Sequence, residues 1–484
     1  MEKLRRTSGV LLHITSLPSE MSLGTFSCEA NKFIDFLDAG GFGCWQILPI
    51  NDLGFGMSPY SACSSFAINP YLIDLTQLLS AEELAVFNFD KNNPWHEECV
   101  KKDSALDLVY KKYLKSYDKS SFEKDNKYWL DDYALYKAIK NKYKKSWVEW
   151  PEGLKNRNKL ALDEFKLKNG YEIDKIKFIQ YIASQQWNSI KKYAKSKGIE
   201  IFGDVPFYVE LDSADVWANP KDWQIENGKA LLVGGTPPDF FNENGQWWGN
   251  PIYNYANMQK NKYSFWVNRF KRAGELYDIV RIDHFIAMHK YWAVKGSEST
   301  AKNGKWLKGA GAELLKAITS KCKIKIVAED LGVVSEGMYA LREKFGIPGL
   351  KILQYAFDGD GDNMNRPHNY EKNSVAYIGT HDNDTFMGLL SDGNWDRINR
   401  YKRYFGIPLE WGNDAVVDNA ILSLYRSSAN MVILTMQDIL KLGSEAKMNV
   451  PGTTDGNWIW QLDSIPSHDV VKTIRYWSDL YSRK

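Results

Sequence analysis

Short runs of apolar and β-branched residues recur along the chain, and each is followed by turn formers and a longer stretch with helical spacing. This alternation predicts strand–helix units whose strands share one parallel sheet. Eight such units predict closure into a (β/α)8 TIM barrel, an α/β fold. The predicted strands are Gly9–His13, Cys44–Leu48, Ile199–Gly203, Asp278–Ile282, Lys323–Ala328, Leu350–Leu353, Val375–Ile378 and Met431–Thr435.

Two long segments interrupt the regular spacing of the predicted strands. Residues 76–197 are rich in Lys, Tyr, Leu, Asp and Glu at helical spacing. We expect a mostly helical insertion there, because a structureless loop of that length is improbable in a compact protein. Residues 210–264 contain GGTPPDFFNENGQWWGNP, which is dense in turn formers and aromatic residues. We therefore interpret residues 1–484 as one barrel whose two insertions overhang the C-terminal face of the strands.

The charge balance argues against a polyanionic partner. The chain has 62 basic and 60 acidic residues and a net charge of +2, so nucleic acid and membrane surfaces are not expected to bind it. No uninterrupted apolar stretch approaches a membrane span, and the amino-terminal segment lacks a signal-type cleavage site. The five cysteines fit neither a metal motif nor a compact disulfide framework, which favours a cytoplasmic location.

Aromatic residues are unusually frequent and include 18 Trp and 27 Tyr. Sugars present flat faces of C–H groups ringed by hydroxyls, and aromatic rings with polar tips match that mixture. The same residues could equally pack the core of a large barrel, so composition alone leaves both interpretations open.

Candidate chemistry gathers where the predicted strands end. In a closed barrel the reactive side chains come from the carboxyl ends of different strands. Four of the apolar runs end in a carboxylate or lead directly into one, and this recurrence is a poor fit to chance. The polar residues at these ends are Asp204, Arg281, Asp283, Glu329, Asp330, His381 and Asp382.

Two of these carboxylates suit retaining glycosidic chemistry, which needs a nucleophile and an acid about 5 to 5.5 Å apart. Asp283 is the better nucleophile, because Arg281 lies two residues earlier on the same face of the strand and can hold it ionised. Glu329 follows apolar residues, so desolvation would raise its pKa and make it the better acid. A structural ion pair is the alternative for Arg281 and Asp283. A helix cap is the alternative for Glu329, although Asp330 could take that part instead.

The third strand-end pair suits a supporting task. Asp382 could grip sugar hydroxyls as the ring flattens toward an oxocarbenium ion, with His381 donating alongside it. The seven histidines lack recognisable ligand spacing, so we expect no metal, and nothing in the sequence indicates another cofactor.

Several longer strings, taken in order, resemble the 4-α-glucanotransferase family, the bacterial amylomaltases and plant disproportionating enzymes that are distant relatives of the α-amylases. The strings include RTSGVLLHITSLP, GDVPFYV, DSADVWANP, VRIDHF, AEDLG, GTHDNDT and PGTTDGNW. Apart from the helical insertion, the resemblance covers nearly the whole chain. It implies transfer of α-1,4-glucan segments between glucans or maltooligosaccharides by a double displacement.

The resemblance also implies roles for individual residues. It makes Asp283 the nucleophile, Glu329 the acid/base and Asp382 the transition-state carboxylate, with Arg281 and His381 in support. The GGTPPDFF segment resembles a flexible loop over the acceptor side. The residues that the resemblance places against glucan are Phe55, Ser58, Tyr60, Asp239, Phe240, Phe241, Trp248, Asn250, Asn449 and Asn457.

The sequence departs from the family pattern in a few places. Phe55 stands where many relatives carry Tyr in a remote glucan-binding groove, which leaves stacking but removes a hydrogen bond. In the first loop, Thr25 and Ser27 replace an Asp and a Gly, which would alter the local turn. We expect no C-terminal β-sandwich of the α-amylase kind, and a monomer or weak homodimer.

Two other functions fit parts of this pattern. An α-amylase-like retaining hydrolase would share the glycosyl-enzyme intermediate but use water as acceptor, and the aromatic segment Pro237–Trp248 favours a sugar acceptor instead. A noncatalytic glucan-binding protein would keep the aromatic groove without turnover, but all three carboxylates are present. A phosphate-handling barrel would need a Gly-rich phosphate loop, which the sequence lacks.

Overall fold

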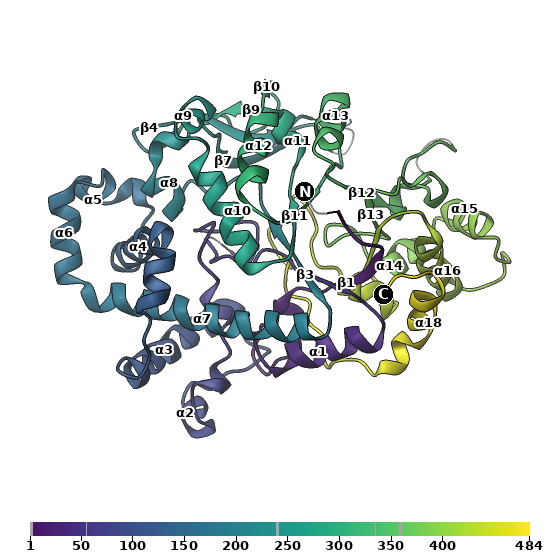
Figure 1. Cartoon of the computed structure of the whole chain (residues 1–484), viewed down its shortest axis with the longest axis horizontal. Coiled ribbons are helices and arrows are strands. Elements are labelled where there is room, and N and C mark those ends of the chain that lie inside the picture. The colour runs from purple at the N-terminus through teal and green to yellow at the C-terminus, as the bar shows by residue number, and fades with distance from the viewer. Residues whose placement is uncertain (1–2, 55, 239–241, 334, 358–360) are drawn as a thin grey trace.

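The predicted barrel is confirmed by a computed structural model that describes residues 3–54, 56–238, 242–333, 335–357 and 361–484 (Figure 1). Its eight parallel strands lie in the order β11-β8-β3-β2-β1-β14-β13-β12. All eight coincide with the runs expected from the sequence, and no end is shifted by more than two residues. The strands are β1 (Thr7–Leu11), β2 (Cys44–Gln46), β3 (Glu200–Val205), β8 (Ile279–Ile282), β11 (Lys325–Ala328), β12 (Gly349–Ile352), β13 (Ser374–Tyr377) and β14 (Met431–Thr435).

Alternation along the strands builds two separate layers of core. Residues such as Leu11 and Ile433 point into the barrel and pack there with Phe202 and Val327. Their chain neighbours, for example Val10, point outward and belong to the larger cluster between the strands and the surrounding helices. Since side chains alternate between faces with a period of two, continuous apolar runs are what a sheet buried on both faces requires.

The barrel closes between β11 and β12. The Ala328 N–H donates to the Pro348 carbonyl at 2.9 Å. On the β12 side of the seam, the Leu350 N–H donates to Oδ1 of Asp330 at 2.7 Å. Asp330 also forms a 3.0 Å ion pair with Arg342. Gly349 faces this pair, where an added Cβ would collide with both side chains. Asp330 therefore seals the seam between β11 and β12, and it does not cap a helix.

Amphipathic helices cover the outside of the barrel. In α1, the buried positions Phe33, Phe36 and Leu37 fall on one face at helical spacing. Ser27 caps this helix by accepting a hydrogen bond from the Glu29 N–H. The other helices of the barrel wall and rim are α10 (Ser264–Leu276), α12 (Gly311–Lys321), α13 (Glu336–Lys344), α14 (Phe386–Ser391), α15 (Trp395–Phe405), α16 (Asn413–Arg426), α17 (Met436–Ile439) and α18 (Lys472–Leu480), with α1 spanning Cys28–Ala39.

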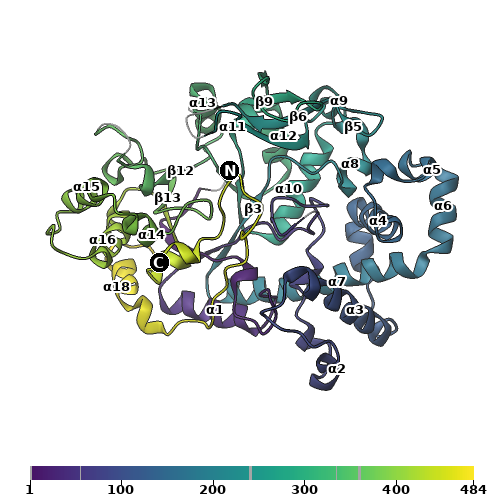
Figure 2. The same ribbon diagram turned by 180° about the vertical axis from the view of Figure 1, so that it is seen from behind.

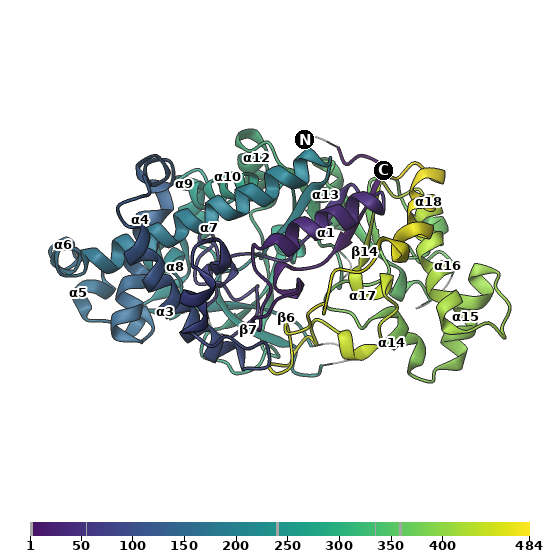
Figure 3. The ribbon, with the colours of Figure 1, turned by 90° about the horizontal axis from the view of Figure 1, so that it is seen from below.

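The segment between β2 and β3 is helical and lies at one end of the molecule, opposite α15 and α18 (Figures 1 and 2). Its long helices α4 and α7 pack side by side, and α7 continues along the barrel near α1 (Figure 3). The helices are α2 (Ala81–Ala85), α3 (Trp95–Tyr113), α4 (Ser120–Tyr143), α5 (Glu152–Lys155), α6 (Lys159–Lys168) and α7 (Gly170–Ser196).

A small antiparallel sheet beside the barrel was not predicted from the sequence. Its strand order is β10-β9-β6-β7, which joins segments on both sides of β8. The aromatic segment between β3 and β8 supplies β6 (Leu232–Thr236) and β7 (Gln246–Pro251), and the segment after β8 supplies β9 (Lys290–Lys295) and β10 (Lys305–Lys308). Short elements flank it: α8 (Ala214–Ala218), β4 (Ile225–Glu226), β5 (Lys229–Ala230), α9 (Tyr255–Lys260) and α11 (Ile286–His289).

Within the described part of the chain, none of the helices combines the length and the apolar character that crossing a bilayer requires.

The buried seam pair predicts a stability effect. Arg342 and Asp330 have side chains only 4% and 2% exposed, so Arg342→Met would leave a buried carboxylate without its partner charge. We expect the free energy of unfolding to fall by about 3 to 5 kcal/mol. Urea denaturation followed by tryptophan fluorescence measures this change.

The matched control is Lys168→Met, which removes an exposed ion pair to Glu164 on the surface of α6 and should leave the unfolding midpoint unchanged. A loss below about 1 kcal/mol in Arg342→Met would contradict the importance of the seam pair.

Candidate active site at the carboxyl ends of the barrel strands

The predicted site residues converge at the carboxyl end of the barrel. Asp204 lies near the end of β3 and is paired in register with Arg281 of β8. Arg281 in turn faces Val327 of β11, so Asp283 and Glu329 each follow the last paired residue of neighbouring strands. Neighbouring strands lie about 4.8 Å apart. The backbone register thus brings the two carboxylates to adjacent positions.

Arg281 is the buried centre of the site. One guanidinium nitrogen, NH2, donates to Oδ1 of Asp283 at 2.7 Å, and the other, NH1, pairs with Asp204. Burial lowers the pKa of Arg281, but the negative charges around it, that of Asp204 first, together outweigh burial and raise this pKa well above its usual value. A permanently charged fork therefore fixes two carboxylates at once.

Tyr60 joins this ion cluster to His381. Its hydroxyl donates to Asp204 at 2.8 Å, accepts from Arg281 NH1 at 3.1 Å and lies 2.9 Å from Nε2 of His381. The two rings are stacked with centroids 5.4 Å apart. Because the phenolic proton is directed at Asp204, the Tyr60 oxygen can only accept from Nε2 of His381, and the single Nε2 proton is shared between this oxygen and Oδ2 of Asp382.

Glu329 is held by the backbone and has an altered acidity. Its carboxylate accepts from the His284 N–H at 2.8 Å and from the Leu331 N–H at 3.0 Å. Burial raises the pKa of Glu329 to about 8; the negative charge of Asp283 also raises it, and Arg281 opposes both. The side chain therefore carries a proton at neutral pH, as a proton donor must.

Asp382 shows the opposite behaviour. Oδ2 lies 3.2 Å from His381 Nε2, and Oδ1 accepts from the Asn449 side-chain amide at 2.6 Å. Burial works against ionisation here, but His381 and Asn449 together hold the pKa of Asp382 well below its ordinary value. Two carboxyl groups of one site are therefore kept in opposite protonation states, a pattern typical of acid and base pairs in catalysis.

His284 links the carboxylates to the neighbouring small sheet. Its backbone has a φ of +48°, in the left-handed region. In this conformation its N–H points to Glu329 and donates a hydrogen bond to the carboxyl group. The imidazole lies edge-on to Trp248, with ring centroids 4.8 Å apart. Burial lowers the pKa of His284 to about 4, so the ring is neutral at pH 7.

The remaining predicted contact residues fall into two groups. Trp248 and Asn449 reach the site through His284 and Asp382. Ser58, Asn250 and Asn457 hold backbone instead: Ser58 Oγ accepts from the Tyr60 N–H, Asn250 donates to the Val209 carbonyl, and Asn457 spans its own loop between residues 450 and 453. Four predicted residues lie outside the described part of the chain: Phe55, Asp239, Phe240 and Phe241.

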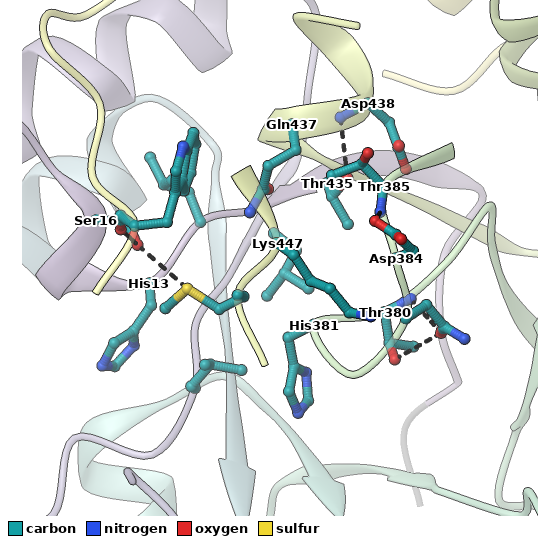
Figure 4. Close-up of a pocket in the computed structure, with 16 residues that line it drawn as sticks. His13, Ser16, Thr380, His381, Asp384, Thr385, Thr435, Gln437, Asp438 and Lys447 are labelled. Atoms are coloured by element: carbon teal, nitrogen blue, oxygen red, sulfur yellow. Dashed lines mark hydrogen bonds between the residues drawn. The ribbon is translucent and has the colours of Figure 1, made fainter. Parts of the chain in front are cut away.

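A pocket lined by both polar and apolar side chains adjoins the site at His381 (Figure 4). The rings of His381 and His13 extend to the same side of this pocket, and the Lys447 side chain runs across it toward Thr380. Burial lowers the pKa of His13 to about 3, so this histidine is neutral. Of the two histidines that line this pocket, His381 is the one that lies beside a carboxylate, that of Asp382.

Sequence reasoning missed three residues of the site. Asp204 was noted as a strand-end carboxylate but received no function, although its position opposite Arg281 follows once β3 and β8 are paired. His284 depends on a backbone conformation that no sequence pattern announces. Trp458 packs 5.9 Å from both Tyr60 and His381 from a loop near the carboxyl end of the chain, and only the tertiary structure brings it there.

Fold and site together define a class of protein. One carboxylate is held by an arginine, and a second, on the neighbouring strand, is kept neutral by burial. Such pairs at the top of a (β/α)8 barrel characterise enzymes that break and form glycosidic bonds. Among the described residues, no group of three or more His, Cys, Asp or Glu side chains is arranged to hold a metal ion.

Comparison with known proteins specifies the family. The family model described as 4-alpha-glucanotransferase matches residues 12–466. A 4-alpha-glucanotransferase of Clostridium butyricum is 40% identical and covers 98% of this chain and 100% of its own length, and a chloroplastic/amyloplastic one of Arabidopsis thaliana is 40% identical over 97% and 84%. The amylomaltase from Streptococcus agalactiae in complex with acarbose superposes with a TM-score of 0.93 at 33% identity, covering 99% and 100%. The chain therefore belongs to the 4-alpha-glucanotransferase family.

The Tyr60 hydroxyl should matter for turnover because it connects three charged or polar groups. Tyr60→Phe removes hydrogen bonds to Asp204, Arg281 and His381 while keeping the ring stack. We expect kcat/KM with maltotriose to fall by about 10- to 100-fold, the equivalent of one hydrogen bond to a charged group. Steady-state release of glucose measures the effect.

Tyr193→Phe is the control, because it removes a 2.7 Å hydrogen bond to Asp35 far from the site and should leave turnover unchanged. Equal activity of both variants would show that the Tyr60 hydroxyl has no part in the reaction.

Proposed function

We propose that this protein transfers α-1,4-glucan segments from a donor to an acceptor glucan through a covalent glycosyl-enzyme intermediate. The family to which the chain belongs supports glucan disproportionation. The observation that carries the mechanism is the contrast between Asp283, fixed by Arg281, and Glu329, protonated by burial on the adjacent strand. Retaining chemistry requires one carboxyl group in each of these two states.

In the first step, Asp283 is the nucleophile. Its free carboxylate oxygen attacks the anomeric carbon, the bond from that carbon to the glycosidic oxygen breaks, and the Glu329 proton moves to the departing oxygen. Arg281 holds the other oxygen of Asp283 at 2.7 Å and so limits its rotation. Two backbone N–H groups bind the Glu329 carboxyl group and hold it in the orientation from which it donates its proton.

In the second step, Glu329 acts as the base. Its carboxylate takes the proton from an acceptor hydroxyl as that oxygen attacks the anomeric carbon, and the ester bond to Asp283 breaks. Asp382, kept ionised by His381 and Asn449, binds hydroxyls of the same sugar ring and supports the positive charge that develops. Two inversions at one carbon preserve the α configuration.

Sugar capture in place of water distinguishes transfer from hydrolysis. Trp248 stands against His284 at 4.8 Å, directly beside the residue that follows the nucleophile. An aromatic ring there offers an acceptor sugar a stacking surface and displaces solvent from the intermediate. The segment containing Trp248 therefore favours the transferase over an α-amylase-like hydrolase, and the intact carboxylates disfavour a noncatalytic binding protein.

The free cysteines and the charge balance of the chain support a cellular location and a class of partner. All five cysteines are free, and three of them are buried, which suits a reducing cytoplasm. Balanced charge supports neutral α-1,4-glucans and maltooligosaccharides as donor and acceptor, with no nucleic acid or membrane partner. We propose a monomer or a weak homodimer that works without a cofactor.

Maltotriose distinguishes the proposed reaction from hydrolysis. Transfer should yield glucose and a ladder of longer maltooligosaccharides while the number of reducing ends stays constant, because each bond broken is replaced by one formed. Chromatography of the products with a reducing-end assay measures both quantities. A rise in reducing ends that matches the glucose released would show that water is the acceptor.

The acidity of Glu329 predicts the alkaline limb of activity. Its pKa is raised to about 8, so the protonated form needed in the first step is present below that pH and is lost as the pH rises through it. We expect kcat/KM for maltotriose to decline above about pH 8. Glu329→Gln should lose most activity on maltotriose but retain attack on α-glucosyl fluoride, whose leaving group needs no proton. A flat wild-type profile to pH 10 would contradict the assignment.

A further inference from the structure

Helix α4 of the helical insertion carries two tyrosine–lysine pairs with the same spacing. The pairs are Tyr133 with Lys137 and Tyr136 with Lys140. Side chains four residues apart lie on one side of a helix, so the two members of a pair can bind one group together. Each pair binds an aspartate that lies outside the insertion, in a segment that follows a barrel strand.

The first pair binds Asp52, which follows β2. Oδ2 of Asp52 accepts hydrogen bonds from the Tyr133 hydroxyl at 2.8 Å and from Lys137 Nζ at 2.6 Å. The Cys63 thiol donates to the same oxygen at 3.0 Å. A carboxylate that is removed from water needs partners of this kind. The buried Asp52 therefore fixes its segment of the chain to α4.

Asp52 lies at the root of a hairpin that carries Tyr60. Segments 52–54 and 61–63 pair in antiparallel fashion: the Cys63 N–H donates to the Asp52 carbonyl at 2.8 Å, and a second main-chain bond of 2.7 Å joins their other ends. We call these two segments, together with Tyr60, the Tyr60 hairpin. Because Tyr60 directly precedes the second segment, a displacement of Asp52 is passed on to the phenol that binds the charged groups of the site.

The second pair reaches the other end of the Tyr60 hairpin through one intermediate residue. The Tyr136 hydroxyl lies 2.8 Å from both the carbonyl oxygen and Oδ1 of Asp212, and Lys140 forms an ion pair with the same carboxylate. Two residues before Asp212, the Glu210 carboxylate accepts a 2.8 Å hydrogen bond from the Ser61 hydroxyl. Helix α4 therefore holds the root of the hairpin directly and its other end through Glu210.

We infer that α4 positions Tyr60 for the reaction, with Lys137 and Tyr133 as its principal positioning residues. This inference rests on the proposed function. The side chains of Lys137 and Asp52 are 24% and 1% exposed, against 35% and 32% for Lys140 and Asp212. Water and salt screen a buried ion pair less than an exposed one. The contact at the root is therefore the stronger of the two.

The position of the Tyr60 hydroxyl tolerates little error. It lies 2.8 Å from Oδ2 of Asp204, 3.1 Å from NH1 of Arg281 and 2.9 Å from Nε2 of His381. A hairpin that keeps only its Ser61 attachment can tilt, and a shift of about 1 Å would take the hydroxyl out of reach of these groups. The helical insertion thereby acts on the reaction through Tyr60.

A double-mutant cycle with Tyr60→Phe tests this link. Lys137→Met should lower kcat/KM for maltotriose by about tenfold in the parent protein, because the displaced hydroxyl loses its hydrogen bonds. In Tyr60→Phe, which has no hydroxyl to displace, the same change should cost less than about twofold. Steady-state release of glucose measures the four proteins, at a temperature where circular dichroism shows each of them folded.

Tyr133→Phe is a second and milder variant, which keeps the inference testable if Lys137→Met does not fold. It removes one hydrogen bond to Asp52 and leaves the ion pair with Lys137 in place. We expect kcat/KM for maltotriose to fall by about threefold in the parent and to stay unchanged when Tyr60→Phe is already present.

Lys175→Met is the matched control. Lys175 of α7 has a side chain 16% exposed and forms ion pairs with Asp107 and Glu172 inside the insertion, so its loss should leave kcat/KM within about twofold of the parent. Losses that multiply in the cycle, unchanged activity in both α4 variants, or an equal loss in the control would each overturn the inference. Failure of the parent protein to disproportionate maltotriose would instead count against the proposed function, so the two failures are distinguishable.

Discussion

The structure depends on a single buried guanidinium at the top of the barrel. Arg281 binds Asp204 on one neighbouring element and Asp283 on its own strand, and Tyr60 connects this cluster to His381. A charge removed from water must be compensated by well-placed partners. The segments that supply those partners come from regions far apart in sequence, so the ionic centre both requires the closed sheet and determines where its reactive carboxylates stand.

Around this centre, two carboxyl groups have pKa values shifted in opposite directions. Asp382 accepts a hydrogen bond from Asn449, lies against Nε2 of His381 and stays ionised, whereas Glu329 is desolvated beside the negative charge of Asp283 and keeps its proton. The acid and base functions therefore come from the surroundings of the carboxyl groups and not from residue type. Transfer then requires only that a sugar reach the intermediate before water does.

Much of the barrel could be predicted because its strands are buried on both faces and form apolar runs in the sequence, as Gly9–His13 and Met431–Thr435 do. Strand-end carboxylates were equally visible, since barrel chemistry occurs at that edge. The small sheet escaped prediction because its pairing joins residues near 235 to residues near 292 across β8, a non-local event that leaves no local pattern. The conformation of His284 and the arrival of Trp458 were invisible for the same reason.

Glu329 and Asp330 are chain neighbours with divided duties: the first serves the site, and the second holds the seam of the barrel through Leu350 and Arg342. The proton donor Glu329 is therefore one peptide bond away from Asp330, the residue that joins β11 to β12. Any loosening of β12 from β11 displaces the acid before the remaining strands separate. It follows that heat inactivation of such a protein can report the opening of one joint, while spectroscopic probes of the remaining fold still register an intact molecule.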